Sequence, residues 1–187
     1  KKVKKAGAVK NLTLQQTLRK HHLSTLTDGT LIVQSYIMPL LYSFIFIPTI
    51  MRGDFFLSDI PTSFFGVAFL VGSIFGSFFG SPNSFLGVAI SLERENYTFL
   101  KTLPIPFKSF LVDKFLLISL VQHSLPVAVY LLMLLFFLKP PLLLTLFFLL
   151  GVLVAAMLAS QAVYWRDYRL LSLNWQNVSQ LFSRGKS

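Results

Sequence analysis

Long hydrophobic runs separated by short polar stretches dominate the pattern of this chain. Residues 31–51, 62–92 and 142–163 carry no charged side chain, and residues 115–138 are equally apolar apart from isolated polar positions. A helix needs about 20 residues to cross a hydrocarbon core of about 30 Å. The pattern therefore predicts four membrane-spanning helices, at about 31–51, 62–91, 110–138 and 142–163.

These spans divide the chain into three predicted parts. Residues 1–30 form a basic lead-in, residues 31–163 a transmembrane domain with a polar loop at 93–106, and residues 164–187 a tail or a link to further spans. The composition is 54% hydrophobic and only 13% charged, with a mean hydropathy of +0.67, which is too apolar for a soluble domain. We therefore expect an all-α fold, a polytopic transmembrane helix bundle. The chain has no Cys, which excludes disulfides and thiolate metal sites.

The distribution of basic residues predicts the orientation of the bundle. The net charge of +10 would by itself also suit a nucleic-acid-binding protein. If both ends and the 93–114 loop lie on one side, 15 of the 17 Lys and Arg are there, and only Arg52 and Lys139 lie opposite. The positive-inside rule then makes both ends cytoplasmic. Because the charges are divided among three loops, we expect no nucleic-acid partner.

The loop at 93–106 is predicted to contain a short amphipathic helix. The apolar residues that share one face at helical spacing are Leu92, Phe99, Leu100 and Leu103. Acidic residues stand at the start of this segment and Lys101 at its end, as the helix dipole favours. The sequence Pro104-Ile-Pro106 ends the helix before the next span. A helix that merely anchors the loop at the membrane surface is one interpretation of this pattern.

The sequence around this loop resembles the first cytoplasmic loop of bacterial ABC exporter permeases of the ABC-2-like class. The resemblance rests on Ser91-Leu-Glu-Arg-Glu, then Phe99-Leu-Lys-Thr-Leu-Pro-Ile, then a Lys at the head of the following span. The tail segment Leu171-Ser-Leu-Asn-Trp175 is similar to a later cytoplasmic segment of the same permeases. In that family the loop is a coupling helix that docks on a separate ATPase. The resemblance and the helix pattern together give Glu93, Arg94, Glu95, Phe99, Leu100, Lys101 and Pro104 as expected coupling residues.

The same resemblance implies a transport function. The chain would be a permease subunit of an ATP-driven exporter in the bacterial cytoplasmic membrane, with an ABC ATPase, membrane lipid and a second permease copy or homologous half as partners. The chain has no P-loop motif, so we expect it to bind no cofactor and to be no enzyme, with ATP and Mg on the partner ATPase. Similar permeases have at least six spans per subunit, and the chain starts with Lys and has no signal peptide. We therefore expect an internal piece of a longer permease.

Small residues recur at intervals of four in two of the predicted spans. They are Gly72, Gly76 and Gly80 in the second span and Gly151, Ala155 and Ala159 in the fourth. A row of small residues lets a neighbouring helix approach closely. Helix packing is therefore the favoured interpretation, and lining of a substrate path is the alternative.

A polar stripe interrupts the third predicted span. Ser119, Gln122 and His123 fall on one face of the helix. Intramembrane polar residues often mark function, and hydrogen bonding between helices explains them as well. Lys114, at the head of the span, is expected to extend its ammonium group toward the interface.

Two further classes of function stay open, a membrane-embedded enzyme and a noncatalytic membrane assembly or immunity protein. An enzyme would use Glu93 and Glu95 as paired carboxylates, but positions i and i+2 of a helix face different directions. His21 and His22 do not indicate a metal site, because adjacent side chains point apart and no third ligand is near.

Overall fold

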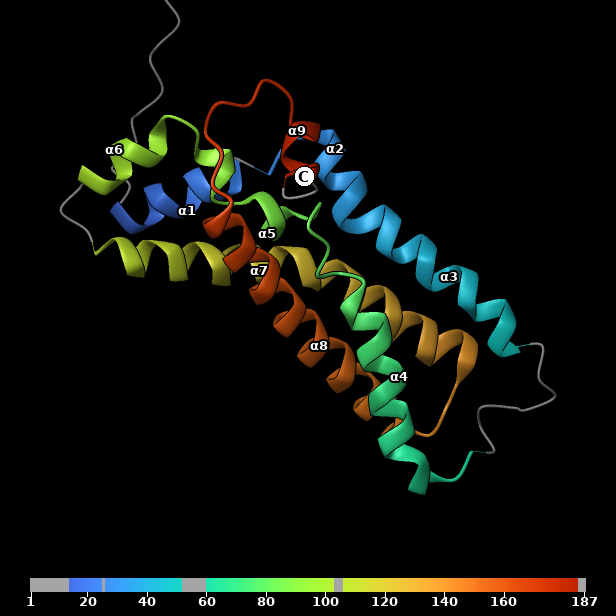
Figure 1. Ribbon diagram of the computed structural model, residues 1–187. Helices are drawn as coiled ribbons and strands as arrows, with labels where there is room; N and C mark the ends of the chain where they lie inside the picture. Colours follow the sequence, from blue (N-terminus) through green and yellow to red (C-terminus); the bar gives the residue numbers. More distant parts are fainter. Residues whose placement is uncertain (1–13, 25, 52–59, 103–105, 185–187) are drawn as a thin grey trace, which may run out of the picture.

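The structure, a computed structural model, describes residues 14–24, 26–51, 60–102 and 106–184. Every regular element within these ranges is helical, which confirms the expected all-α class (Figure 1). In chain order the elements are α1 (Leu14–Ser24), α2 (Gly29–Ile32), η1 (Val33–Ile37), α3 (Met38–Met51), η3 (Thr62–Phe64), α4 (Phe65–Ser77), α5 (Phe85–Val88), η4 (Ser91–Glu93), α6 (Asn96–Thr102), α7 (Phe107–Met133), η5 (Leu134–Leu138), α8 (Leu142–Arg169) and α9 (Ser179–Phe182).

Three helical stretches within the described residues are long and apolar enough to cross a membrane, namely Gly29–Phe46, Phe107–Leu138 and Leu142–Arg169. They correspond to the first, third and fourth predicted spans. The first begins at Asp28, whose carboxylate accepts the N–H groups of Thr30 at 2.9 Å and Leu31 at 3.2 Å and so caps the helix. These helices indicate a membrane protein.

The second predicted span differs from the structure. The expected single helix over 62–91 ends at Ser77, so the apolar helix Thr62–Ser77 is shorter than the other three. The chain then turns through Gly80 and Pro82 and resumes as the short α5, whose N-cap is Ser84. A fourth membrane-crossing helix is therefore not confirmed. The sequence stays hydrophobic from residue 62 to residue 91, but the helix is interrupted after Ser77.

Side chains from neighbouring helices form hydrogen bonds with backbone groups in the non-helical segment between α4 and α5 and at the start of α5. The Gln122 amide of α7 donates to the Phe79 carbonyl at 2.7 Å and accepts the Leu86 N–H at 3.1 Å. The Ser35 hydroxyl of η1 accepts the Phe85 N–H at 2.8 Å. An irregular backbone at membrane depth is tolerated only where such partners exist, so the break is a specific part of the fold.

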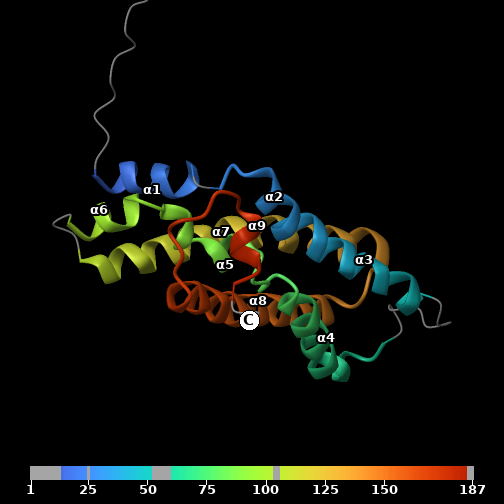
Figure 2. The same cartoon turned by 45° about the horizontal axis from the view of Figure 1, so that its top comes forward.

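The glycines of α4 allow it to lie directly against α8, and both cartoons show these two helices side by side (Figures 1 and 2). A Cβ atom added at Gly76 would lie 2.8 Å from the Cα of Val152, and one at Gly72 would lie 3.0 Å from the Cα of Phe148. A Cβ at Gly151 would collide in the same way with the backbone of α4 at Phe69. The two backbones thus approach more closely than side chains would permit.

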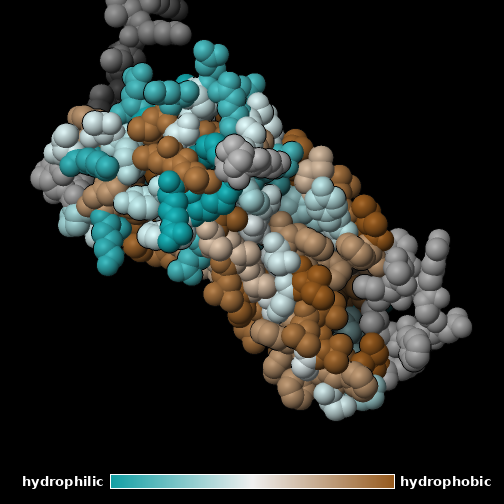
Figure 3. Space-filling view, viewed as in Figure 1, coloured by the Kyte–Doolittle hydropathy of each residue, from teal (hydrophilic) through white to brown (hydrophobic). Residues whose placement is uncertain are grey.

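Polar and apolar side chains are separated along the molecule. Helices α1 and α6 lie over the first part of α7, and α9 lies next to α5, nearer the middle of the molecule (Figures 1 and 2). On the face shown in Figure 3 hydrophilic side chains cluster at the end that contains α1 and α6, while the remainder is hydrophobic. We call this region the polar end. It contains the loop between α5 and α7 that the sequence singled out.

Candidate functional site

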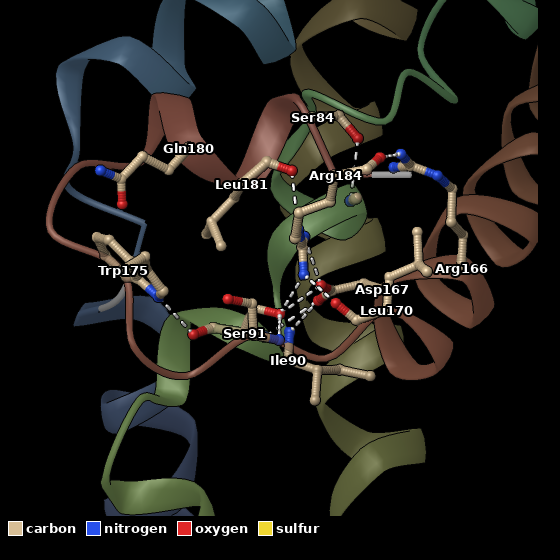
Figure 4. A network of polar contacts seen from close by, with 12 residues as sticks. Ser84, Ile90, Ser91, Arg166, Asp167, Leu170, Trp175, Gln180, Leu181 and Arg184 are labelled. Carbon is tan, nitrogen blue, oxygen red and sulfur yellow. Dashed lines mark hydrogen bonds and ion pairs between the residues drawn. The ribbon is translucent and has the colours of Figure 1, made fainter. Parts of the chain in front are cut away.

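The backbone of Ile90 and Ser91 is held by a buried carboxylate at the polar end. Asp167, near the end of α8, is 0% exposed. One of its oxygens accepts the N–H groups of Ile90 at 2.7 Å and Ser91 at 3.1 Å, and the other accepts the Ser91 hydroxyl at 2.7 Å (Figure 4). The carboxylate therefore acts as a cap for η4 supplied by a different helix.

Arg184, beyond α9, completes this first cluster. Its guanidinium pairs with Asp167 at 2.8 Å and donates to the Ser91 hydroxyl at 2.6 Å. It also donates to the carbonyls of Leu170 at 2.9 Å and Leu181 at 2.8 Å (Figure 4). A planar guanidinium with several fixed donors suits such a task. The tail is thereby closed onto the end of α8.

The tail also contacts the loop through an aromatic ring. The indole N–H of Trp175 donates to the Ser91 carbonyl at 2.9 Å. The guanidinium of Arg94 lies 3.5 Å from the centre of the Trp175 ring, within the range of a cation–π contact. Arg94 has a φ of 48°, a conformation that non-glycine residues seldom adopt. These contacts fix the sharp turn that leads from η4 to α6.

A second buried ion pair holds the other side of the loop. Glu93 is 1% exposed and forms an ion pair with Lys114 of α7, which is 0% exposed. The second oxygen of Glu93 lies 2.7 Å from the Nε2 atom of His21 in α1. Lys114 thus points to Glu93 rather than to the interface as expected from the sequence.

The ionic partners of Glu93 control its protonation. Burial alone would raise the pKa of this carboxyl group, but the hydrogen bond with His21 and the ion pair with Lys114 outweigh it and lower the pKa to about 2. Glu93 is therefore ionised at neutral pH. In α1 the neighbouring His22 is buried against Phe110, with ring centres 4.9 Å apart, and burial followed by the charge of Lys114 lowers its pKa to about 4.

The short helix α6 projects from this doubly held segment. Helix α6 (Asn96–Thr102) lies within the predicted 93–106 loop, and Leu103 and Pro104 lie outside the described residues. A coupling role for this helix stays a prediction. Leu100 is buried, whereas Phe99 is 62% exposed. The ammonium of Lys101 lies 4.4 Å from the centre of the ring of Tyr97, which is itself buried.

This arrangement changes the roles expected for the loop residues. Glu93 does not present its carboxylate to the surface, and the side chain of Leu100 is used inside the molecule. Glu95 and Phe99 are exposed. The difference arises because helical spacing predicts which residues share a face but not which of them the rest of the chain covers.

The other residues singled out in the sequence lie in the apolar body. Gly80, in the turn after α4, lies against Ala159 of α8, whereas Ala155 is only partly buried. His123 of α7 forms a 3.0 Å hydrogen bond with Ser160 of α8. Gln122 supports the break after α4, and Ser119 is buried beside His123 on the same helix. The residues of the predicted polar stripe therefore contact two different parts of the chain: Gln122 contacts the segment after α4, and His123 contacts α8.

Sequence reasoning missed the residues that hold the loop from a distance. Asp167 and Arg184 are 17 residues apart, and Ser91 and Arg184 are 93 apart. One feature of the sequence indicates such a contact: Asp167 follows a long apolar run, and acidic residues in such positions are usually paired with a basic residue.

The chemistry of the polar end is structural. Its two buried carboxylates are each fully engaged, and Glu95, the other acid of the loop, is exposed. Within the described part of the chain no three His, Cys, Asp or Glu side chains gather as metal ligands would. These contacts hold the backbone at Ile90 and Ser91 and the start of the loop in place.

A scan against protein-family models, a search of curated proteins and a search of solved structures each found no match for this chain.

Proposed function

We propose that this chain is the transmembrane permease subunit of an ATP-driven ABC exporter and that α6 transmits force from a separate ATPase subunit. The observation that carries the proposal is that the segment before α6 is held in place while one face of α6 is exposed. Two buried ion pairs, Asp167–Arg184 and Glu93–Lys114, hold the segment just before it, and Phe99 projects from it with 62% of its surface exposed. A helix that transmits force between subunits has to be attached firmly to its own chain and exposed where the partner binds.

The firm attachment of α6 matters because coupling between subunits needs an element that moves as a unit. Tyr97 and Leu100 attach the inner face of α6 to the bundle. A push on α6 would therefore reach α7 through Lys114 and α8 through Asp167. These are two of the three long helices, so the force would be distributed over the apolar body.

The exposed face of α6 offers a suitable docking surface. A buried aromatic anchor surrounded by charges is a common centre of protein interfaces. Phe99 would supply the anchor, and Glu95 and Lys101 would orient the partner. ATP and Mg would be bound by the ATPase, and a second permease copy or a homologous half would complete the transporter.

The proposal is tested by recovering the ATPase with the tagged permease from native membranes. We expect Phe99→Ala to insert normally but to lose most of the ATPase, because truncation of a central anchor costs about 2 kcal/mol or more, or roughly 30-fold in affinity. Phe137→Ala is a matched control, because Phe137 is 79% exposed but lies in η5, which follows α7 at the end far from α6. Recovery of the ATPase at the same ratio from both variants would contradict the proposal.

The proposal also includes an orientation in the bacterial cytoplasmic membrane. The polar end would face the cytoplasm, where basic residues concentrate. Because the chain has no Cys, Glu95→Cys and Lys139→Cys give clean single labels. An impermeant maleimide added to intact cells should react with the second and not the first, and the reverse pattern would invert the topology.

A further inference from the structure

An apolar groove separates the beginning of α7 from the end of α8. Its volume is about 820 Å³, which is within the usual range for a small-molecule site. Phe107, Leu111 and Phe115 line it along α7, and Trp165 and Tyr168 line it along α8. The groove lies beside the polar end, and Ile90, whose N–H is bound by Asp167, is also one of its lining residues.

One end of the groove is basic. Lys108, in the first turn of α7, is exposed and is the single charged side chain among the described residues that line the groove. Arg169 of α8 contacts a lining residue, with its guanidinium 5.1 Å from the centre of the Trp165 ring. Since no lining residue in the described part is acidic, the positive charge of Lys108 faces the groove without a carboxylate.

The aromatic residues indicate the depth of this end. Trp165 and Tyr168 stack with ring centres 5.5 Å apart, and such residues collect at the boundary between headgroups and hydrocarbon. Phe115 lies seven residues beyond Lys108 on α7, or about 10 Å farther along the helix axis at 1.5 Å per residue. The groove therefore begins at headgroup level and continues toward the hydrocarbon core.

We propose that this groove binds an anionic phospholipid. The acyl chain lies along Leu111 and Phe115, and the phosphate pairs with Lys108, with Arg169 close by on Trp165. A basic group above an apolar channel matches the two parts of a lipid molecule. A second copy of the chain fits less well, because the cores of protein interfaces are poor in Lys.

The test uses the fluorescence of Trp165. The chain has two Trp, so Trp175→Phe leaves a single reporter in the groove. This variant is reconstituted into vesicles that contain brominated phosphatidylglycerol or brominated phosphatidylcholine at equal mole fraction. We expect phosphatidylglycerol to occupy the site about fivefold more strongly per basic contact, and we expect Lys108→Gln to remove most of this preference.

Two controls make the result specific. Lys139→Gln removes a charge at the opposite end of α7 and should leave the preference unchanged. Trp175 donates a hydrogen bond to Ser91, so a second measurement keeps this residue. Native mass spectrometry compares the phosphatidylglycerol retained by the protein with both Trp in place and by its Lys108→Gln variant. Equal quenching by the two lipids overturns the proposal, as does a preference that survives Lys108→Gln. Absence of quenching by either lipid overturns it too, because a protein surface would then cover the groove.

Discussion

Removal of one partner of the Glu93–Lys114 pair should be far more harmful than removal of both. Glu93→Gln leaves the ammonium of Lys114 buried without its counter-charge, since Lys114 is 0% exposed. Breaking a buried pair in this way costs about 3–5 kcal/mol. For a chain of this size 1 kcal/mol corresponds to about 2–4 °C in melting temperature, so we expect a loss of about 6–20 °C.

The double variant Glu93→Leu with Lys114→Met gives the decisive comparison. Apolar replacement of a whole buried pair is often neutral or stabilising, so most of the loss should be recovered. Thermal unfolding in detergent, followed by the fraction of monodisperse protein, measures all variants. Glu95→Gln is the control, because this neighbouring acid is exposed and should change the melting temperature little. If the double variant loses as much as the single variants Glu93→Leu and Lys114→Met combined, the pair is not the coupled unit described above.

Three other expectations concern helix packing, pH and the broken backbone. Gly76→Ala should lower the folded yield, because its methyl would lie 2.8 Å from the Cα of Val152, whereas Gly66→Ala on the same helix meets nothing within 4 Å and should be neutral or stabilising. Burial lowers the pKa of His22 from 6.5 to about 4. Because the unfolded chain binds this proton at a higher pH than the folded chain does, the free energy of unfolding should fall by about 3 kcal/mol in total as the pH is lowered from about 6.5 to 4. His22→Phe should make the melting temperature depend less on pH in this range. Gln122→Leu leaves two peptide groups at the break without partners and should cost about 2 kcal/mol or more, measurable as a lower melting temperature.

The helical class and three long helices could be predicted from hydropathy because each run is long and nearly free of charge. The interruption of the helix after Ser77 could not be predicted, since residues of the same type as Gly80 and Pro82 also occur within intact membrane helices. What decides the outcome is the position of Gln122 and Ser35, which supply the missing hydrogen bonds. These partners come from other helices, and one sequence does not reveal such pairings.

The location of the candidate site was predictable, but its internal contacts were not. The charge cluster and the prolines marked the loop, and α6 lies within it. Spacing along a helix gave no information that Glu93 would turn toward Lys114 and His21, or that Asp167 would cap the loop from the end of α8. Contacts of this kind depend on the crossing of helices, which the linear pattern does not contain.

The closure of the tail onto Ser91 has a consequence for biosynthesis. Arg184 follows Ser91 by 93 residues, so at about 5–20 residues per second the ribosome completes it roughly 5–20 s later. During that interval the N–H groups of Ile90 and Ser91 have no partner until Asp167 is made, and Asp167 and the Ser91 hydroxyl have no cation until Arg184 is made. This cluster can therefore be completed only after all three long helices have been made. A stop codon between Asp167 and Arg184 would leave a carboxylate buried at the end of α8 without its cation.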